Sequence, residues 1–517
     1  MTTDARRVRV LVIGAGFAGL AMARAMDRAG ERDFLVLERG PEVGGTWRDN
    51  SYPGAACDVP SQLYSYSFAP NPGWSRSYSP QPEIQSYLKT VADRSGVLDR
   101  VVLETTVEDV CWDATSQAWR VRARGPGGLL RVVADVVVSA AGALSDPRTP
   151  DLAGFERFAG RVFHSARWDH GYDLTGKRVA VIGTGASAVQ IVPEIAEHAA
   201  HLDVYQRTAP WVVPRNDRTY PPLERAALAR VPGLQRLYRA GVYWSREAYL
   251  PAFTRWPGLF RPAERAVLRN IAAAIDDPEL RARVTPHFAF GCKRVLLSNT
   301  WYPTLARDDV ELVTDPIDHL TETGIVTRDG RLREVDAVVV ATGFHATDLP
   351  IAALITGRNG ETLADHFALH GAQAYKGTTV HGWPNLFLLV GPNTGLGHSS
   401  MVFMIESQVG YVLDALLYLR QLRHLRRTGA VRPGGRVALE PRPEAQAAWV
   451  QDVQRRLSRT VWNRGGCASW YLDAHGRNVT LWPRATFTFR RLLSRFDPAA
   501  YDVVPADVPA DPERVTA

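Results

Sequence analysis

Residues 8–38 read VRVLVIGAGFAGLAMARAMDRAGERDFLVLE. A β-branched run, a glycine turn, an alanine-rich helical stretch and a second apolar run that ends in an acid predict a βαβ unit. Gly14 permits the tight turn, Gly16 lets backbone N–H groups approach a pyrophosphate, and Gly19 allows the helix to pack closely on the strand. Glu38 ends the second strand, where a carboxylate accepts hydrogen bonds from ribose hydroxyls and repels a 2′-phosphate. These features predict a dinucleotide-binding unit.

A second copy of the pattern begins at Arg178 and reads RVAVIGTGASAVQIVPEIAEHAAHLDVYQR. Its second strand ends at Arg207 and Thr208 instead of an acid, and a guanidinium can bind a 2′-phosphate through two parallel hydrogen bonds. The other interpretation of Arg207 is a solvated surface arginine. We expect this unit to bind NADPH rather than NADH. Its expected contacts are Gly183, Thr184, Gly185, Ala186, Ser187, Ala188 and Gln190.

Two dinucleotide sites of opposite ribose preference in one chain need a chemical reason. Hydride transfer from NADPH to a flavin is the simplest such reason. The cofactors that we expect are therefore FAD in the first unit, with Glu38 on its adenosine ribose, and NADPH in the second.

The segments between and after the two units predict how the domains are arranged. Residues 101–142 alternate apolar and polar residues in short runs, which predicts a β-meander of the first domain. Strand-to-glycine junctions at 335–344 and 385–393 indicate that the chain re-enters the first domain after the second. We therefore predict an α/β fold with two interleaved dinucleotide-binding (Rossmann-like) domains. The expected division is 1–150 for the first part of the FAD-binding domain, 151–340 for the NADP-binding domain with a helical insertion at about 215–290, and 341–517 for the return to the FAD-binding domain plus a C-terminal strap.

The insertion is rich in arginine, alanine, proline and aromatic residues. One interpretation is a helical lid whose arginines are solvated and whose aromatic side chains line the core or a substrate passage. The other is a weak membrane-surface contact. The aromatic residues also hint at a bulky, apolar substrate.

The composition excludes several classes of protein. Apolar residues make up 45% of the 517 residues and charged residues 22%, close to the averages for globular proteins, which excludes a disordered, collagen-like or coiled-coil chain. The net charge of +7 is spread along the chain, so we expect an anionic small molecule rather than nucleic acid as a partner.

The four cysteines, Cys57, Cys111, Cys292 and Cys467, lie far apart and form no CxxC pair. This spacing argues against a disulfide framework, a metal site or a dithiol redox pair, and a reducing cytoplasm is the expected location. The N-terminal residues lack the apolar core and cleavage site of a secretory signal. We see no stretch of about 18 uncharged apolar residues and expect no transmembrane helix.

The segment before the second unit reads FAGRVFHSARWDH and matches the pattern FxGxxxHxxxW[PD]. This pattern resembles the signature of type I Baeyer–Villiger monooxygenases. The related flavin-containing monooxygenases that oxidise nitrogen and sulfur share much of it but usually lack the Trp-Pro or Trp-Asp ending. Four further segments are similar to the same family: 44–68, 205–211, 291–305 and 391–401.

The resemblance implies an FAD-dependent, NADPH-consuming monooxygenase that inserts one oxygen atom of O₂ next to a ketone carbonyl through a flavin peroxide and gives an ester or lactone. One alternative is an N- or S-oxygenating flavin-containing monooxygenase, and another is a non-catalytic NADPH-binding sensor. A disulfide reductase would need a redox cysteine pair just beyond the glycines of the first domain, where Cys57 stands alone.

The resemblance also implies roles for single residues. Arg294 stabilises the peroxide anion and the adduct that it forms, Asp58 orients Arg294, and His164 couples domain orientation to catalysis. Lys293 contacts the 2′-phosphate of NADP. The plainer interpretations are two phosphate-binding cations, an aspartate that caps a turn and a hydrogen-bonded loop histidine. The remaining expected contacts are Phe17, Ala18, Arg39, Gly45, Thr46, Trp47, Asp58, Tyr64, Val107 and Met401 for FAD, and Arg294 and Trp470 for NADP.

Overall fold

The computed structural model describes residues 5–427 and 437–504. Its largest sheet has the order β17-β4-β5-β6-β1-β2-β3, and β18 pairs with β6. Within it, β1 runs parallel to β2 and to β6, whereas β4, β5 and β6 are joined antiparallel, as expected of a meander. The strands are β1 (Arg6–Ile13), β2 (Phe34–Leu37), β3 (Val101–Val102), β4 (Thr106–Asp113), β5 (Ala118–Gly125), β6 (Gly128–Ser139), β17 (Ile355–Thr356) and β18 (Leu386–Leu388).

The second sheet, of order β12-β9-β8-β16-β7, is parallel throughout. Its strands are buried from both sides, which explains why runs such as RVAVI are almost wholly apolar. It contains β7 (Arg161–His164), β8 (Arg178–Ile182), β9 (His201–Tyr205), β12 (Val310–Val313) and β16 (Ala337–Val340). Smaller sheets are formed by β10 (Val212–Val213) with β11 (Leu296–Leu297), and by β13 (Ile317–Leu320), β14 (Gly324–Thr327) and β15 (Leu332–Glu334).

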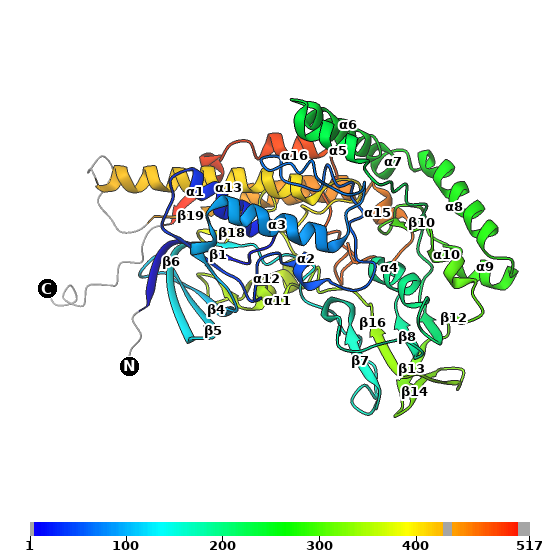
Figure 1. Ribbon diagram of the computed structural model, residues 1–517. Helices are drawn as coiled ribbons and strands as arrows, with labels where there is room; N and C mark the ends of the chain where they lie inside the picture. Colours follow the sequence, from blue (N-terminus) through cyan, green and yellow to red (C-terminus); the bar gives the residue numbers. More distant parts are fainter. Residues whose placement is uncertain (1–4, 428–436, 505–517) are drawn as a thin grey trace.

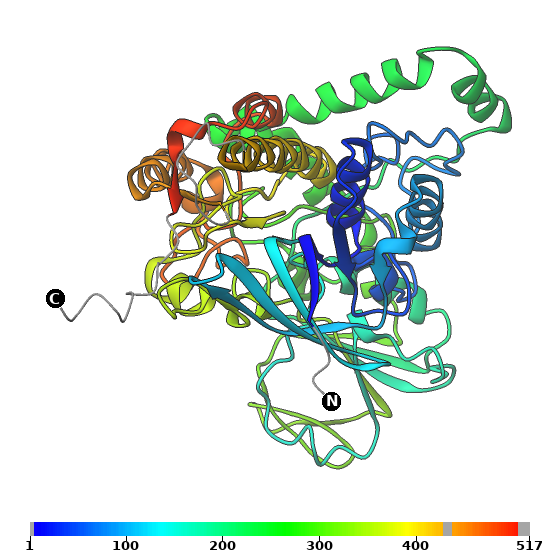
Figure 2. The ribbon, with the colours of Figure 1, turned by 90° about the vertical axis from the view of Figure 1, so that its left-hand side faces the viewer.

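The chain order of the strands confirms the interleaved α/β fold. The apolar run at 335–344 forms β16, which pairs with β7 and β8 in the second sheet, so the prediction that this run returns to the first domain was wrong. The later strands β17 and β18 do pair in the first sheet, and β18 lies within the predicted run 385–393. Figure 1 shows the two sheets side by side, with α13 and α16 above them, and Figure 2 views the molecule from the side of the first sheet. The helices outside the insertion are α1 (Phe17–Arg28), α2 (Thr46–Asp49), α3 (Gln81–Ser95), α4 (Ala186–Ile195), α10 (Trp301–Leu305), α11 (Pro350–Ala353), α12 (Leu363–His370), α13 (Met401–Arg427), α14 (Pro443–Leu457), α15 (Val461–Arg464) and α16 (Thr486–Leu492).

The insertion is helical, as the composition predicted. It runs along the upper edge of the molecule, next to α16 (Figure 1). Its helices are α5 (Pro222–Arg230), α6 (Leu234–Glu247), α7 (Leu250–Thr254), α8 (Arg261–Ala274) and α9 (Pro278–Val284).

The C-terminal segment returns to the first domain. There β20 (Tyr501–Val504) pairs antiparallel with β19 (Ala438–Pro441). The rest of the expected strap, residues 505–517, lies outside the described residues.

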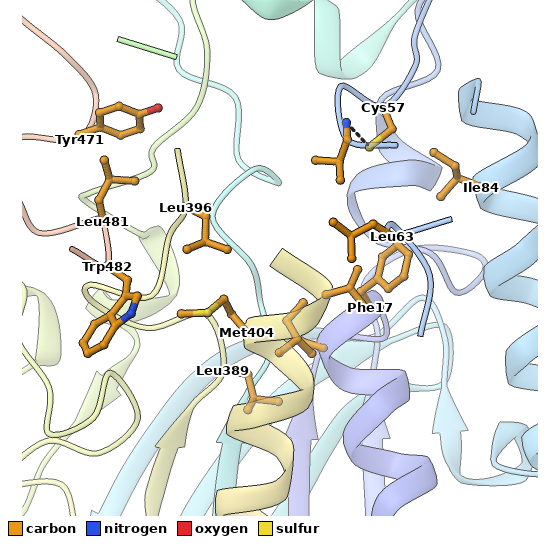
Figure 3. Close-up of a cluster of buried hydrophobic side chains, with 14 of the residues drawn as sticks. Phe17, Cys57, Leu63, Ile84, Leu389, Leu396, Met404, Tyr471, Leu481 and Trp482 are labelled. Atoms are coloured by element: carbon orange, nitrogen blue, oxygen red, sulfur yellow. Dashed lines mark hydrogen bonds between the residues drawn. The ribbon is translucent and has the colours of Figure 1, made fainter. Parts of the chain in front are cut away.

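One large hydrophobic cluster joins both domains and positions the site. It includes Phe17 from α1, Leu63 from the 44–68 segment, Met404 from α13 and Tyr471 from the C-terminal segment. Figure 3 shows these side chains, which come from separate parts of the chain, with Met404 between Tyr471 on one side and Phe17 and Leu63 on the other.

Helix α13 bears on the expectation that the chain has no transmembrane helix. Within the described residues, its Met401–Leu425 stretch is long and apolar enough to cross a membrane by length and composition alone. Most of that stretch is buried in the protein, and α13 packs against α1. It has the burial of a core helix.

Candidate active site

The first glycine turn has the geometry that the fingerprint predicted. Gly14 has φ +102°, and a Cβ on it would lie 2.7 Å from the carbonyl oxygen of Ala140. A Cβ on Gly19 would lie 1.9 Å from the carbonyl oxygen of Gly14, so neither position accepts a side chain. Gly16 caps α1 without a side-chain hydrogen bond, and α1 begins at Phe17. The first N–H groups of this helix therefore remain available to an anion.

Glu38 is held at the end of β2, beside this turn. Its Oε2 accepts the Ala15 N–H at 2.7 Å, and its Oε1 accepts the Gly40 N–H at 2.8 Å and Arg48 Nη1 at 2.6 Å. Burial lowers the pKa of Arg48, but Glu38 and Asp49 outweigh it and raise that pKa above its ordinary value. The carboxylate is thus fixed where a ribose would lie.

The second turn repeats the arrangement. Gly183 has φ +115°, and its Cβ would lie 2.6 Å from the carbonyl oxygen of Ala341. Gly185 caps α4 without a side-chain bond, and a Cβ there would meet open space. Gln190 of α4 accepts the Tyr52 hydroxyl at 3.0 Å and donates to the carbonyl of Ala56 at 3.0 Å. This residue joins the second domain to the 44–68 segment of the first.

Two cations lie close enough beyond the end of β9 for one to affect the other. Burial lowers the pKa of Lys293, and the positive charge of Arg207 lowers it further. Arg207 and Thr208 are exposed, and Thr184 Oγ1 donates to the Thr208 carbonyl at 3.2 Å. Because two like charges converge at one place, an anion between them would stabilise both.

Arg294 and Asp58, which the resemblance pairs, are in direct contact in the structure. Arg294 donates from Nε to Asp58 Oδ2 and from Nη2 to Asp58 Oδ1, both at 2.6 Å. Burial raises the pKa of Asp58, but the Arg294 guanidinium outweighs burial and holds that pKa below its ordinary value. Burial likewise lowers the pKa of Arg294, and Asp58 overcomes this and raises it. Both groups therefore stay charged at neutral pH.

A small cavity at the junction of the two domains runs along Asp58. The first domain contributes Cys57 and Asp58 to it, and the second contributes the start of α4 and Arg215. The Arg215 guanidinium also lowers the pKa of Asp58, to a smaller extent than Arg294 does. Its full lining is Cys57, Asp58, Ala186, Val189, Gln190, Arg215, Leu296 and Leu297.

The C-terminal segment reaches the same pair. Tyr471 is buried, and its pKa is raised to about 12 by burial and by Asp58, against the opposing charge of Arg294. Trp470 is 44% exposed, and its ring lies 4.6 Å from that of Tyr471.

Cys292 and Cys467 form a disulfide, so the prediction from cysteine spacing that the chain has no disulfides was wrong. These residues are 175 positions apart in the chain, so spacing alone did not reveal the pairing. The bond ties the loop that carries Lys293 and Arg294 to the segment that carries Trp470.

The comparisons with known proteins agree with this geometry. The model of the flavin-binding monooxygenase-like family matches residues 7–234. A Baeyer–Villiger monooxygenase of Streptomyces coelicolor is 50% identical over 507 residues, which cover 97% of this chain and 94% of that one. A Baeyer–Villiger monooxygenase of Pseudomonas aeruginosa is 46% identical over 499 residues, 96% of this chain and 92% of that one. The chain belongs to the Baeyer–Villiger monooxygenase family.

Solved structures of this family share the fold. An oxidised steroid monooxygenase bound to NADP has a TM-score of 0.81 and 34% identity, covering 96% of this chain and 100% of that chain. Cyclohexanone monooxygenase from Rhodococcus sp. Phi1 bound to NADP⁺ has a TM-score of 0.82 and 28% identity, covering 97% and 100%.

His164, from the family signature, lies apart from the charged pair. Its Nδ1 accepts the Ala166 N–H at 3.0 Å, and among the described residues its Nε2 has no hydrogen-bond partner. Burial lowers the pKa of His164 to about 4, so the ring is neutral at pH 7. It ends β7 and pairs with Val340, the last residue of β16, after which the chain returns to the first domain. This placement suits a positioning role and not proton transfer.

Three of the residues that the resemblance assigns to the flavin lie near the first turn. The indole of Trp47 donates to the Tyr64 hydroxyl at 3.0 Å, and the Tyr64 ring lies 5.2 Å from that of Phe17. A Cβ on Gly45 would lie 3.0 Å from Gly16 Cα, so the backbone of Gly45 packs directly against the first glycine turn. Thr46 begins α2 and Met401 begins α13.

Two expected FAD contacts are already engaged with other groups. Val107 is buried in a second hydrophobic cluster that also contains Leu11 and Leu37. Arg39 donates to Asp146 Oδ1 at 2.5 Å and to the carbonyl of Ser145 at 2.8 Å.

Sequence reasoning missed Arg48, Arg215 and Tyr471. Arg48 lies within the 44–68 segment and Tyr471 follows Trp470, so the signal for both was a position next to residues that were singled out. Arg215 follows the 205–211 segment and had no signal of its own.

One group outside the site has the residue types of a metal site. The ligand atoms of His201, Asp203 and Glu311 lie within 4.8 Å of one another. Glu311, however, accepts Arg333 Nη2 at 2.8 Å and Arg331 Nη1 at 3.1 Å, so arginines already balance its charge. We assign no metal to this group.

Proposed function

We propose that this chain catalyses the Baeyer–Villiger oxidation of a ketone. One ketone, one O₂, one NADPH and one proton give one ester or lactone, one NADP⁺ and one water. The observation that supports this reaction best is the two-fold hydrogen-bonded Asp58–Arg294 pair, which lies beside a cavity shared by both dinucleotide-binding domains.

The residues present fit both cofactors. The uncapped start of α1, Gly14 and Glu38 would hold the pyrophosphate and ribose of FAD. The uncapped start of α4 and the converging charges of Arg207 and Lys293 would hold the pyrophosphate and 2′-phosphate of NADPH. The bound flavin, reduced by NADPH, supplies the activation of dioxygen.

Arg294 supplies a fixed positive charge to the reaction. Its bonds to Asp58 use Nε and one hydrogen of Nη2, which leaves the Nη1 hydrogens to donate to an oxygen atom that gains negative charge. A guanidinium held in place before the reaction stabilises such an oxygen without reorganisation. Asp58 keeps the group charged and correctly oriented.

The C-terminal segment borders the site. Tyr471 lies beside Arg294 and Asp58, and the Cys292–Cys467 bond ties its segment to the loop of Lys293 and Arg294. Excluding water at this place would strengthen the field of Arg294 on the reacting oxygen.

The ketone is proposed to be bulky and apolar, because the insertion is rich in aromatic residues. A cytoplasmic location remains a prediction, and the disulfide removes the cysteine argument for it.

The test is a panel of ketones, sulfides and tertiary amines incubated with the FAD-loaded protein, NADPH and air. We expect esters or lactones from ketones, with NADPH consumed in proportion. Formation of sulfoxides or N-oxides alone would overturn the proposal in favour of the heteroatom-oxidising alternative. A colourless protein that does not take up FAD would favour a sensor.

A further inference from the structure

Large apolar side chains stand exposed where the insertion meets α16. Leu237 is 72% exposed, Trp244 58%, Phe487 47% and Leu492 36%. The rings of Trp244 and Phe487 lie 5.8 Å apart, and Phe487 and Leu492 line one open depression. Leu237 and Trp244 are seven residues apart on α6 and therefore share one side of it. The four residues form one patch, which we call the α6–α16 face.

The charge around this face is positive. Residues 225–246 and residues 474–496 contain no aspartate or glutamate. Of their arginines, Arg239 and Arg246 turn to the first domain, while Arg477 pairs with Asp473. Arg484, Arg491 and Arg495 line the same depression as Phe487. A surface with this charge is complementary to an anionic partner.

The single acid of α6 does not offset these charges, because it points inward. Glu247 is 7% exposed, accepts the Thr486 hydroxyl at 2.7 Å, and lies 3.4 Å from His398. These contacts also fix α6 against α16, so the face is preformed.

The combination of exposed tryptophan, leucine and phenylalanine with arginine is that of a helix lying in a membrane interface. Aromatic and aliphatic groups enter the headgroup boundary while arginines bind lipid phosphates. The face forms part of the upper edge of the molecule, along which the insertion helices run (Figure 1).

The other side of α6 contacts the first domain near the proposed active site. Arg239 Nη1 donates to the carbonyl of Gln62 at 2.9 Å, and Arg246 Nη2 donates to the Tyr78 hydroxyl at 2.9 Å. Gln62 belongs to the segment that carries Asp58. Helix α6 thus lies between its outer, exposed side and the segment that carries Asp58, as a lid would. A bilayer on the outer side of α6 would therefore lie over this helical lid.

We propose that the α6–α16 face docks the protein on an anionic lipid bilayer, from which an apolar substrate can enter beneath the lid. The docking does not depend on the proposed reaction, because it is measured without substrate or NADPH. Its failure and the failure of the proposed function are therefore separate results.

The experiment is flotation of the FAD-loaded protein with vesicles of phosphatidylcholine alone or with about a third phosphatidylglycerol. We expect binding to the mixed vesicles only, and release at about 1 M salt, where the Debye length falls to about 3 Å. Leu237→Ser with Trp244→Ser should weaken binding at least tenfold, because two anchoring side chains are lost. Arg491→Ser with Arg495→Ser should weaken it by about 25-fold, or about fivefold for each arginine near the surface.

Matched controls lie far from this face in the fold. Leu369 on α12 is 71% exposed, and the Arg157 side chain in the loop before β7 is 79% exposed. Leu369→Ser and Arg157→Ser should leave binding unchanged, and flavin content and melting temperature verify that every variant is folded.

Three results would overturn the proposal. One is a wild-type protein that does not float with the mixed vesicles, and another is an equal loss in the control variants. The third is a dimer in sedimentation velocity that Trp244→Ser dissociates while flotation stays unchanged, because the face would then be a contact between two copies of the chain.

Discussion

Replacing Arg294 by alanine separates cofactor binding from oxygen transfer. The substitution removes two hydrogen bonds of 2.6 Å and leaves Asp58 with an unpaired charge. The side chains of Arg294 and Asp58 are 30% and 26% exposed, so water screens part of this loss, and the cost in unfolding free energy should be about 1 to 2 kcal/mol. The variant should fold and bind FAD.

The effect on the reaction should be much larger. Losing a fixed donor to an oxygen that gains charge costs about 2.7 to 4 kcal/mol, or a factor of about 100 to 1000 in rate. Flavin reduction by NADPH, followed by stopped-flow absorbance, should stay within about threefold of the wild type, because Lys293 and Arg207 are intact. NADPH oxidation should then end as hydrogen peroxide, and little ester should form.

Arg294→Lys is the matched control, since it keeps the charge but loses the planar fork that binds Asp58. We expect it to recover part of the ester yield. An Arg294→Ala protein that makes ester at near wild-type yield per NADPH would refute the role of this arginine.

Four further predictions test other parts of the site. Arg207→Ala should raise the NADPH Michaelis constant about tenfold or more and leave that for NADH nearly unchanged, because a charge-assisted hydrogen bond to the 2′-phosphate is worth about 1.5 to 3 kcal/mol; equal weakening for both nucleotides contradicts the assignment. Glu38→Arg should purify mainly without FAD, since it removes the carboxylate beside Ala15; full flavin content by absorbance shows that the first turn was misread. Cys292→Ser with Cys467→Ser should lower the unfolding free energy by up to about 5 kcal/mol on the chain-entropy argument, measured by urea titration; four reactive thiols in the denatured, unreduced wild type would show that the bond does not form. Burial lowers the pKa of His164 to about 4 from an ordinary value of 6.5, so the unfolded chain takes up the proton first, and stability should fall by up to about 3 kcal/mol between pH 6.5 and 4; an unfolding free energy that falls as steeply in His164→Gln removes this explanation.

The fold could be predicted because its decisive features are local. Gly14, Gly19 and Glu38 lie within one βαβ unit, where each residue type follows from a turn, a helix contact or a strand end. The return of β18 to the first sheet was readable from the apolar run 385–393. The similar run 335–344 forms β16 of the second sheet, and the two-residue strand β17 had no signal in the sequence.

The catalytic pair could not be derived in this way. Asp58 and Arg294 are 236 residues apart, and spacing alone says nothing about their contact. The resemblance to a family supplied the prediction. The Cys292–Cys467 bond also joins residues that are far apart in the sequence, 175 positions in this case. It was missed because neither cysteine has another cysteine nearby in the sequence.

Partners of the residues that were singled out also escaped prediction. Arg48 binds Glu38 from a separate turn, and Tyr471 packs beside Arg294 from the C-terminal segment. Both are ordinary residue types whose role depends on tertiary packing.

The most direct test of the central claim uses ¹⁸O₂ with the FAD-loaded wild-type protein, NADPH and the best ketone of the panel. We predict that each ester or lactone molecule carries one ¹⁸O atom, in the ring or bridging position next to the carbonyl, for each NADPH consumed. Mass spectrometry of the product measures this directly. An unlabelled ester, or ¹⁸O found only in hydrogen peroxide and water while the ketone is recovered unchanged, would contradict the account.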